Sequence, residues 1–101
     1  MSAYIIVYRE TPVCDEAAIA EYSRRNYANA AAAAESTGVR PLVVYGAVDA
    51  LEGKAPDGVV VLRFPTVEQA RAWYESPEYQ EAIPFRKQAA DWRVVLVEGV
   101  A

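Results

Sequence analysis

Arg86 is the residue whose position most strongly suggests chemistry. It belongs to a set spaced four, three and four residues apart, which share one face of a helix: Tyr79, Ile83, Arg86 and Ala90. This face is expected to point into the core. A buried guanidinium needs a partner, because an unpaired buried charge is strongly unfavourable. Two partners stay open: the carboxylate of Glu52 in an ion pair, or a carboxylate or enolate of a substrate, which a planar guanidinium can hold through two hydrogen bonds.

Glu52 is the carboxylate that we favour as a general base. It precedes a glycine in a turn beside a strand end, where enclosure next to an apolar sheet would make it a stronger base. The alternative role is structural, as the partner of Arg86 or as an acceptor that orders the loop. In an enzyme, Glu52 or a tyrosine, with Tyr79 as the candidate, would transfer the proton. Arg86 would then stabilise an oxyanion.

A second group of candidates lies on the alanine-rich segment. Tyr22, Asn26 and Asn29 are spaced four and three residues apart and would form a polar line along a helix. Asparagine is a poorer helix former than alanine, so its presence here has a cost. The line either borders a ligand cleft or simply faces solvent.

The other substrate-binding candidates are arginines and aromatic residues: Arg40, Tyr45, Arg63, Trp73 and Tyr74. Trp73 is expected in the core stripe of its helix, with Tyr74 turned toward the next helix. Whether Arg63 and Tyr45 face a cleft or a dimer seam depends on the strand register. Seven tyrosines and two tryptophans can line a pocket that suits a planar hydrophobic or aromatic ligand.

The sequence also excludes several kinds of chemistry. It contains no histidine and one cysteine, so Ser-His-Asp and Cys-His catalysis, histidine-ligated haem and the common zinc sites are ruled out. The acidic residues show no recognised metal-ligand pattern, and no glycine-rich phosphate loop occurs. We therefore predict that the protein uses neither a metal nor another cofactor.

Length and charge narrow the class of protein further. With 101 residues, the chain is expected to form one domain over residues 1–101. A net charge of −4 with scattered basic residues argues against binding to nucleic acid. No apolar run is long enough to cross a membrane, and the N-terminus does not resemble a signal peptide. A cytoplasmic location is expected.

Four segments have the composition of β-strands, because they are rich in β-branched and aromatic residues and are bounded by turn residues. They are residues 3–10, 39–48, 59–64 and 92–99. Pro41, near the start of the second segment, predicts an edge strand or a bulge, since proline cannot donate a hydrogen bond to a sheet. Residues 49–58 are expected to form a loop.

The remaining segments predict helices. The alanine-rich stretch 16–37 contains neither proline nor glycine, so a long helix should end at Gly38. Thr66–Gln69 fits a capping box that opens a second helix. Ser76-Pro77 should end that helix and start a third, because proline is favoured at the first helical position. Pro84 is expected to kink or break the third helix.

The resulting order, β-α-β-β-α-β, predicts an α+β, ferredoxin-like fold with an antiparallel four-stranded sheet and helices on one face. The strands, however, are apolar on both faces. A monomer would leave an apolar sheet face on the order of several hundred Å² in water, which soluble monomers rarely do. We therefore expect a symmetric homodimer that forms through this sheet face.

Several phrases carry a family resemblance: Leu51–Gly53, Phe64–Ala82, Arg86 with Gln88–Asp91, and Arg93–Gly99. Together they resemble the bacterial proteins known as domain of unknown function 1330, in the dimeric α+β barrel superfamily. The resemblance spans nearly the whole chain, and AWYESPEY is its most specific block. It implies a ferredoxin-like homodimer whose sheets pack face to face. It implies little about activity, because the superfamily includes cofactor-independent monooxygenases, polyketide cyclases, muconolactone isomerase and haem enzymes.

The sequence departs from the family pattern around its second strand. Family members usually carry Gly-Gly-Arg ahead of this strand and Arg-Gly-Gly after it. Here the region reads STGVRPLVVYGAV, so Arg40 keeps the first arginine position and Tyr45 stands where the second is expected. If that second arginine serves the family's ligand, the departure implies a ligand that is less anionic and more aromatic.

Three functions stay open at this stage. The first is a cofactor-independent cyclase, isomerase or lyase that acts on an aromatic or polyketide-like carbonyl compound. The second is a non-catalytic ligand-binding or accessory homodimer, in which the arginine and the glutamate are structural. The third is a cofactor-free monooxygenase, in which a carbanion of the substrate itself reacts with oxygen. The sequence slightly favours the first over the second.

Overall fold

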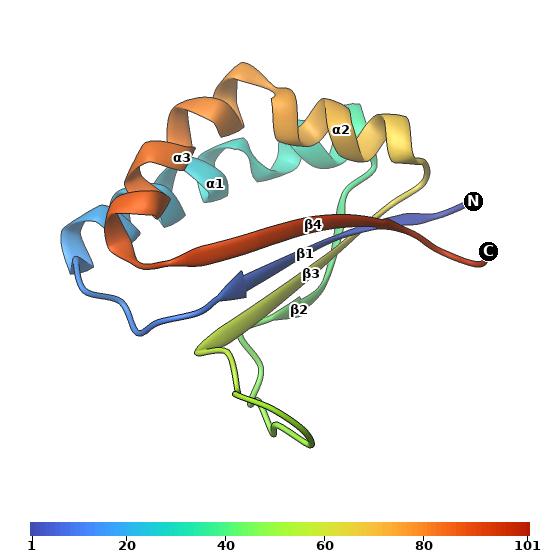
Figure 1. The fold of residues 1–101 in the computed structure, drawn as a ribbon. Coiled ribbons are helices and arrows are strands. Elements are labelled where there is room, and N and C mark those ends of the chain that lie inside the picture. Colours follow the sequence, from blue (N-terminus) through green and yellow to red (C-terminus); the bar gives the residue numbers. More distant parts are fainter.

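The computed structural model describes residues 1–101 as four strands and three helices. In chain order they are β1 (Ala3–Arg9), α1 (Glu16–Thr37), β2 (Arg40–Val44), β3 (Gly58–Phe64), α2 (Val67–Glu75), α3 (Pro77–Ala89) and β4 (Trp92–Glu98). The strands form one antiparallel sheet in the order β2-β3-β1-β4. All three helices cover the same face of this sheet (Figure 1). The predicted ferredoxin-like α+β fold is confirmed, with its second helix divided into α2 and α3.

The ends of α1 follow from its capping residues. The Asp15 carboxylate accepts a hydrogen bond from the backbone N–H of Ala18 at 2.9 Å, which satisfies one free donor of the first turn. Gly38 ends the helix at φ 72°, as predicted. A Cβ at this position would also lie 2.8 Å from the Pro65 ring, so both the backbone angle and the close approach require glycine.

Hydroxyl caps start the other two helices. Thr66 Oγ1 accepts from the N–H of Gln69 at 3.1 Å, and Ser76 Oγ accepts from the N–H of Tyr79 at 3.4 Å. Both caps were predicted. The helix is not broken at Pro84, however, but continues to Ala89. Pro84 is exposed, so water can solvate the carbonyl that loses its donor.

β2 is the edge strand that Pro41 predicts. Its register against β3 shifts between Pro41 and Val43, so the predicted bulge is also present. The strand ends at Val44, four residues before the expected end. The chain then turns at Tyr45, whose φ of 55° is unusual for a residue other than glycine. The loop 45–57 projects from the sheet on the side away from the helices (Figure 1).

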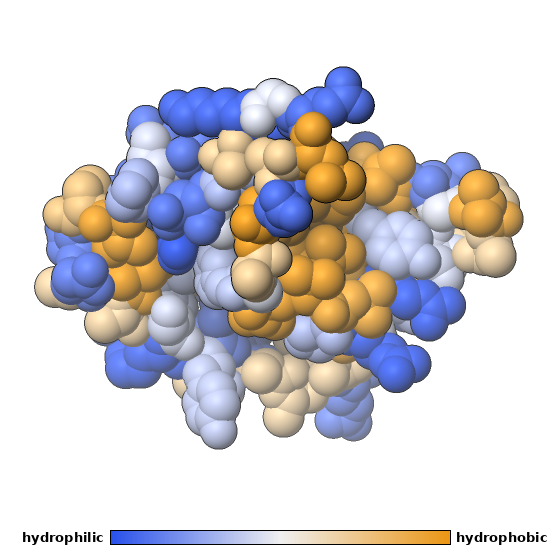
Figure 2. Space-filling model, turned by 90° about the horizontal axis from the view of Figure 1, so that it is seen from below, coloured by the Kyte–Doolittle hydropathy of each residue, from blue (hydrophilic) through white to orange (hydrophobic).

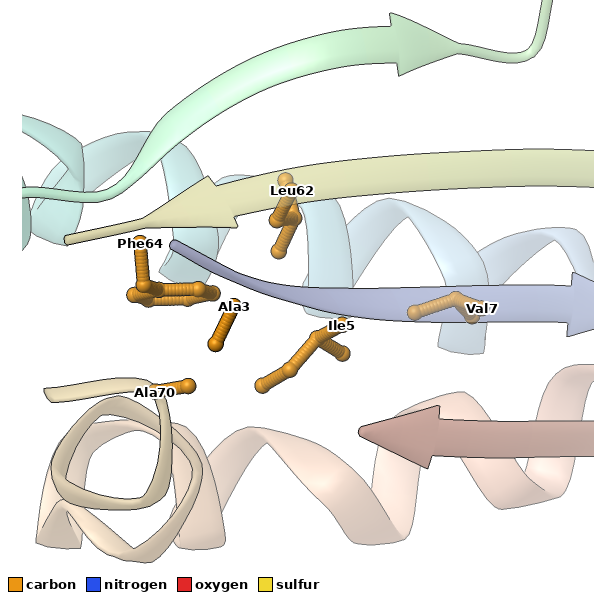
Figure 3. Packing of buried hydrophobic residues seen from close by; sticks show 6 residues of the cluster. All are labelled: Ala3, Ile5, Val7, Leu62, Phe64 and Ala70. Carbon is orange, nitrogen blue, oxygen red and sulfur yellow. The ribbon is translucent and has the colours of Figure 1, made fainter. Parts of the chain in front are cut away.

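The closed part of the core lies where α2 meets the sheet. It is built from alternate residues of β1 and β3 and one residue of α2: Ala3, Ile5, Val7, Leu62, Phe64 and Ala70 (Figure 3). Phe64 and Ala70 have no exposed surface. Because alanine is small, α2 can come close to the sheet here.

The other sheet face has no helix over it. The side chains that alternate with the core residues are also largely apolar: Tyr4, Ile6, Tyr8, Val59, Val61, Val95 and Val97. We call this set the open face, and hydrophobic side chains gather at its centre (Figure 2). Val97 is 47% exposed. The predicted apolar character of both faces is confirmed. None of the helices combines the length and apolar character needed to cross a membrane.

Candidate functional site

The largest hollow in the protein lies between α1 and the β2–β3 half of the sheet. It has a volume of about 630 Å³ and is lined by 18 residues, of which 14 are hydrophobic. We call it the cavity. It exists because α1 packs mainly on α3 rather than on the sheet, and because alanines of α1, between residues 30 and 34, leave room below the helix. Its size and apolar walls are those of a small-molecule pocket.

The predicted polar line on α1 borders the cavity. Tyr22, Asn26 and Asn29 all contribute to its lining, so the cleft interpretation holds rather than full exposure to solvent. Tyr45 lines the cavity from the end of β2. None of the lining residues is charged, so the polar groups that the lining side chains offer are hydroxyls, amides and the Trp73 indole N–H.

Tyr79 is the residue through which α3 contributes to the cavity lining. Its ring is 3% exposed, and its hydroxyl lies 2.9 Å from that of Tyr22. Burial, followed by the neighbouring Tyr22, raises the pKa of Tyr79 far above its ordinary value, although the charge of Arg86 opposes the shift. Burial likewise raises the pKa of Tyr45. Both phenols are therefore neutral at physiological pH and can donate hydrogen bonds.

The aromatic residues of α2 lie as the sequence predicts. Trp73 packs between Phe64 and Tyr79, with ring centroids 5.8 and 4.1 Å away, and it also lines the cavity. Tyr74 turns toward α3, with its ring 5.6 Å from that of Tyr79. Tyr74 lines a separate, smaller hollow beside Leu96 and lies outside the main cavity.

Arg86 points inward as predicted and is only 2% exposed. Its guanidinium carbon lies 5.4 Å from the centre of the Trp92 ring, and the Trp92 Nε1–H donates to the Arg86 backbone carbonyl at 2.7 Å. The guanidinium itself takes part in none of the hydrogen bonds or ion pairs of the structure. Its Nε is the only fully buried side-chain nitrogen or oxygen without a partner.

Glu52 does not pair with Arg86, so the expected ion pair is absent. Glu52 is exposed in the loop 45–57, which leaves the sheet on the side opposite to the helices (Figure 1). The sequence places a glutamate beside a strand end but does not show to which side the loop turns. The structure does not bring Glu52 to the cavity, and its role as a general base stays a prediction.

The strand register places Arg40 and Arg63 away from the cavity. The two residues are paired across β2 and β3, and Arg63 also pairs with Tyr4 of the open face. The Arg63 guanidinium donates to Ser2 Oγ at 2.8 and 3.2 Å. Among the predicted binding residues, these two arginines and Tyr74 lie outside the cavity.

Sequence reasoning missed an arginine and a tryptophan at the sheet end where β1 ends and β4 begins. Arg9 pairs with Asp57 at 2.8 Å and lies over the Tyr45 ring, with 4.6 Å between its guanidinium carbon and the ring centroid. Trp92 lies between Arg9 and Arg86. The alternation of β1 places Arg9 on the face of Val7, which could have revealed its helix-side position. No group of three acidic, cysteine or histidine side chains is placed to hold a metal ion.

The structure has a ferredoxin-like fold with an apolar cavity, and comparison with known proteins assigns the family. The chain belongs to the family described as domain of unknown function (DUF1330), whose profile matches residues 2–100. The resemblance inferred from the sequence is thus confirmed. No curated protein matches the chain.

Solved structures share this fold at low sequence identity. A dimeric ferredoxin-like protein of unknown function from Jannaschia sp. CCS1 is 18% identical, with a TM-score of 0.70, and the match covers 98% of this chain and 100% of that one. A protein of unknown function from Rhodopseudomonas palustris is also 18% identical, with a TM-score of 0.69 and coverage of 99% and 83%. SnoaB, a cofactor-independent oxygenase from Streptomyces nogalater, is 15% identical, with a TM-score of 0.63 and coverage of 99% and 93%.

Proposed function

We propose that this protein binds a planar, hydrophobic carbonyl compound in the cavity and converts it without a cofactor, as a cyclase, isomerase or lyase. The cavity itself carries the proposal. Its volume of about 630 Å³ lies within the range of ligand pockets, and 14 of its 18 lining residues are hydrophobic. Aromatic rings at its rim, including Tyr45 and Trp73, suit a planar ring system.

The polar groups of the cavity suggest how a bound carbonyl would be oriented. Asn26 and Asn29 offer amides along α1, and the hydroxyls of Tyr22 and Tyr79 offer donors. Donors of this kind stabilise negative charge that develops on a carbonyl oxygen. Of the two candidates for proton transfer, this geometry favours Tyr79 over Glu52. Because its pKa is raised, Tyr79 would act as the acid and not as the base.

Two other functions keep specific support. A cavity without carboxylate, histidine or other charged lining favours ligand capture without turnover. Cofactor-free oxygenation needs little from the protein beyond binding and activation of the substrate, and the fold is shared with a cofactor-independent oxygenase. Two measurements separate these functions from the main proposal. Ligand capture alone gives no product, and an oxygenase consumes oxygen as it converts its substrate.

We also propose that the working form is a homodimer joined through the open face. This face is apolar at its centre and has no covering helix (Figure 2). The similar protein from Jannaschia is described as dimeric. Val95→Glu on the open face should convert the dimer to a monomer in light scattering at micromolar concentration, because it would place charges in an apolar seam. Ala72→Glu on the exposed surface of α2 is the control, and a wild-type monomer contradicts the proposal.

The ligand proposal is tested by filling the cavity. Ala30→Trp places a large ring into the lining, whereas Ala28→Trp adds the same ring to an exposed position of α1 outside the lining. With naphthalene derivatives as probes, we expect Ala30→Trp to weaken binding at least about tenfold, which corresponds to roughly 1.4 kcal/mol. Ala28→Trp should bind like the wild type. Equal affinities for both variants and the wild type would exclude the cavity as the binding site.

A further inference from the structure

We propose that the ligand of the cavity is an anion and that Arg86 is its receptor, so the natural compound carries a carboxylate, phenolate or enolate oxygen on its hydrophobic body. This inference rests on the proposed function and adds the charge of the ligand. Its starting point is a contrast among the arginines. Those that form ion pairs are Arg9, Arg24, Arg25 and Arg93. Arg86 is almost fully buried and has no partner.

The contact with Trp92 does not compensate for this burial. A guanidinium over an indole ring gains a cation–π interaction, but the cost of removing a charge from water exceeds it. Nε is the only nitrogen of Arg86 that is fully buried without a partner. An anion can therefore still reach the two terminal nitrogens of the guanidinium. The buried guanidinium of Arg86 therefore lacks an acceptor, which the anionic oxygen of a ligand would supply.

Arg86 is not among the lining residues, but it lies one side chain away from the cavity wall. Trp92, over which it lies, has its ring 6.5 Å from that of Tyr22, a lining residue. The charge of Arg86 also acts on two further lining residues, because it counteracts the burial that raises the pKa of Tyr45 and Tyr79. The guanidinium therefore lies within electrostatic range of several cavity walls.

Nothing inside the cavity neutralises this charge. No carboxylate lines it, and burial raises the pKa of Tyr45 and Tyr79. Arg9 adds a second positive group over Tyr45, although Asp57 already balances it. Tyr45, which stands where the resemblance leads us to expect an arginine, thus still has a guanidinium over its ring, that of Arg9. A hydrophobic anion fits both features, an apolar body in the cavity and one negative oxygen at Arg86.

Two probes that share a ring and differ in charge test the inference: 2-naphthoate and 2-naphthamide, titrated by calorimetry. The wild type should bind the carboxylate at least ten times more tightly than the amide. Arg86→Met, which replaces the guanidinium by an apolar chain of similar length, should bind both probes with equal affinity. Arg25→Met on α1, whose guanidinium pairs with Glu21 outside the cavity, should keep the wild-type preference.

The outcomes separate the two proposals. If the wild type binds both probes equally, the anion inference is wrong while the cavity remains a ligand site. If it binds neither probe, both proposals fail. Thermal unfolding without a probe is a second readout: Arg86→Met should raise the melting temperature, because an uncompensated buried charge is removed. A large fall would show that Arg86 is structural. If Arg86→Met does not fold, Arg86→Lys keeps the charge and should reduce the preference through its poorer geometry.

Discussion

Alanine has opposite effects under α2 and under α1. Under α2, Ala70 has no exposed surface and brings the helix down onto Phe64 and Ala3, so the core there is closed (Figure 3). Under α1, alanines such as Ala30 and Ala33 line a cavity of about 630 Å³. The same small residue therefore gives close packing on one side of the layer and a hollow on the other.

The difference is set by what supports each helix. α2 rests directly on β1, β3 and β4, and the large rings of Phe64 and Trp73 fill the space beside it. α1 instead rests on α3, where Tyr22 meets Tyr79 edge to face. A helix supported from the side does not need to descend to the sheet. Its alanines can then face a hollow without loss of the helix itself.

Matched enlargements should show this contrast as the largest effect. Ala70→Leu enlarges a side chain that has no exposed surface, so we expect a loss of about 1–3 kcal/mol in the free energy of unfolding. Ala30→Leu adds the same volume at the cavity, and the two residues have similar helix propensities, so the change should stay within about 0.5 kcal/mol. Urea titrations of both variants measure this difference. Equal losses would mean that the cavity is closed in solution.

The fold could be predicted largely because its signals are local. The caps at Thr66 and Ser76 and the terminal glycine at Gly38 each act within a few residues, and each lies where the sequence places it. The alternation of the strands also indicates two apolar faces. At Pro84 the sequence predicts a kink or a break, and the break is absent because α3 continues to Ala89.

The site was less predictable because it depends on distances between elements. Helical spacing correctly places Arg86 inward, but it leaves open whether Tyr22 borders a cleft, as it does in the structure. Strand register then separates Tyr45, which faces the cavity, from Arg63, which does not, and spacing within one strand cannot settle that choice. Of the two partners left open for Arg86, Glu52 is excluded by the course of its loop, and no residue pattern fixes the side to which a loop turns.

Tyr79 lies between the closed core under α2 and the cavity under α1. Its ionisation should change the free energy of unfolding less than the enlargement of Ala70 does. In the folded state its pKa is raised above its ordinary value of 10.0, so the unfolded chain loses this proton first. The contribution of this proton to the free energy of unfolding is fully present below pH 10 and is lost as pH rises, by at most about 1.4 kcal/mol per pH unit.

Tyr79→Phe should be less stable than the wild type at pH 7 by about 0.5–1.5 kcal/mol, because the hydrogen bond to Tyr22 is gone. Above pH 10 this gap should close, whereas Tyr27→Phe, at an exposed position, should follow the wild-type curve throughout. A gap independent of pH in urea titrations from pH 7 to 11 would contradict the burial of the Tyr79 hydroxyl.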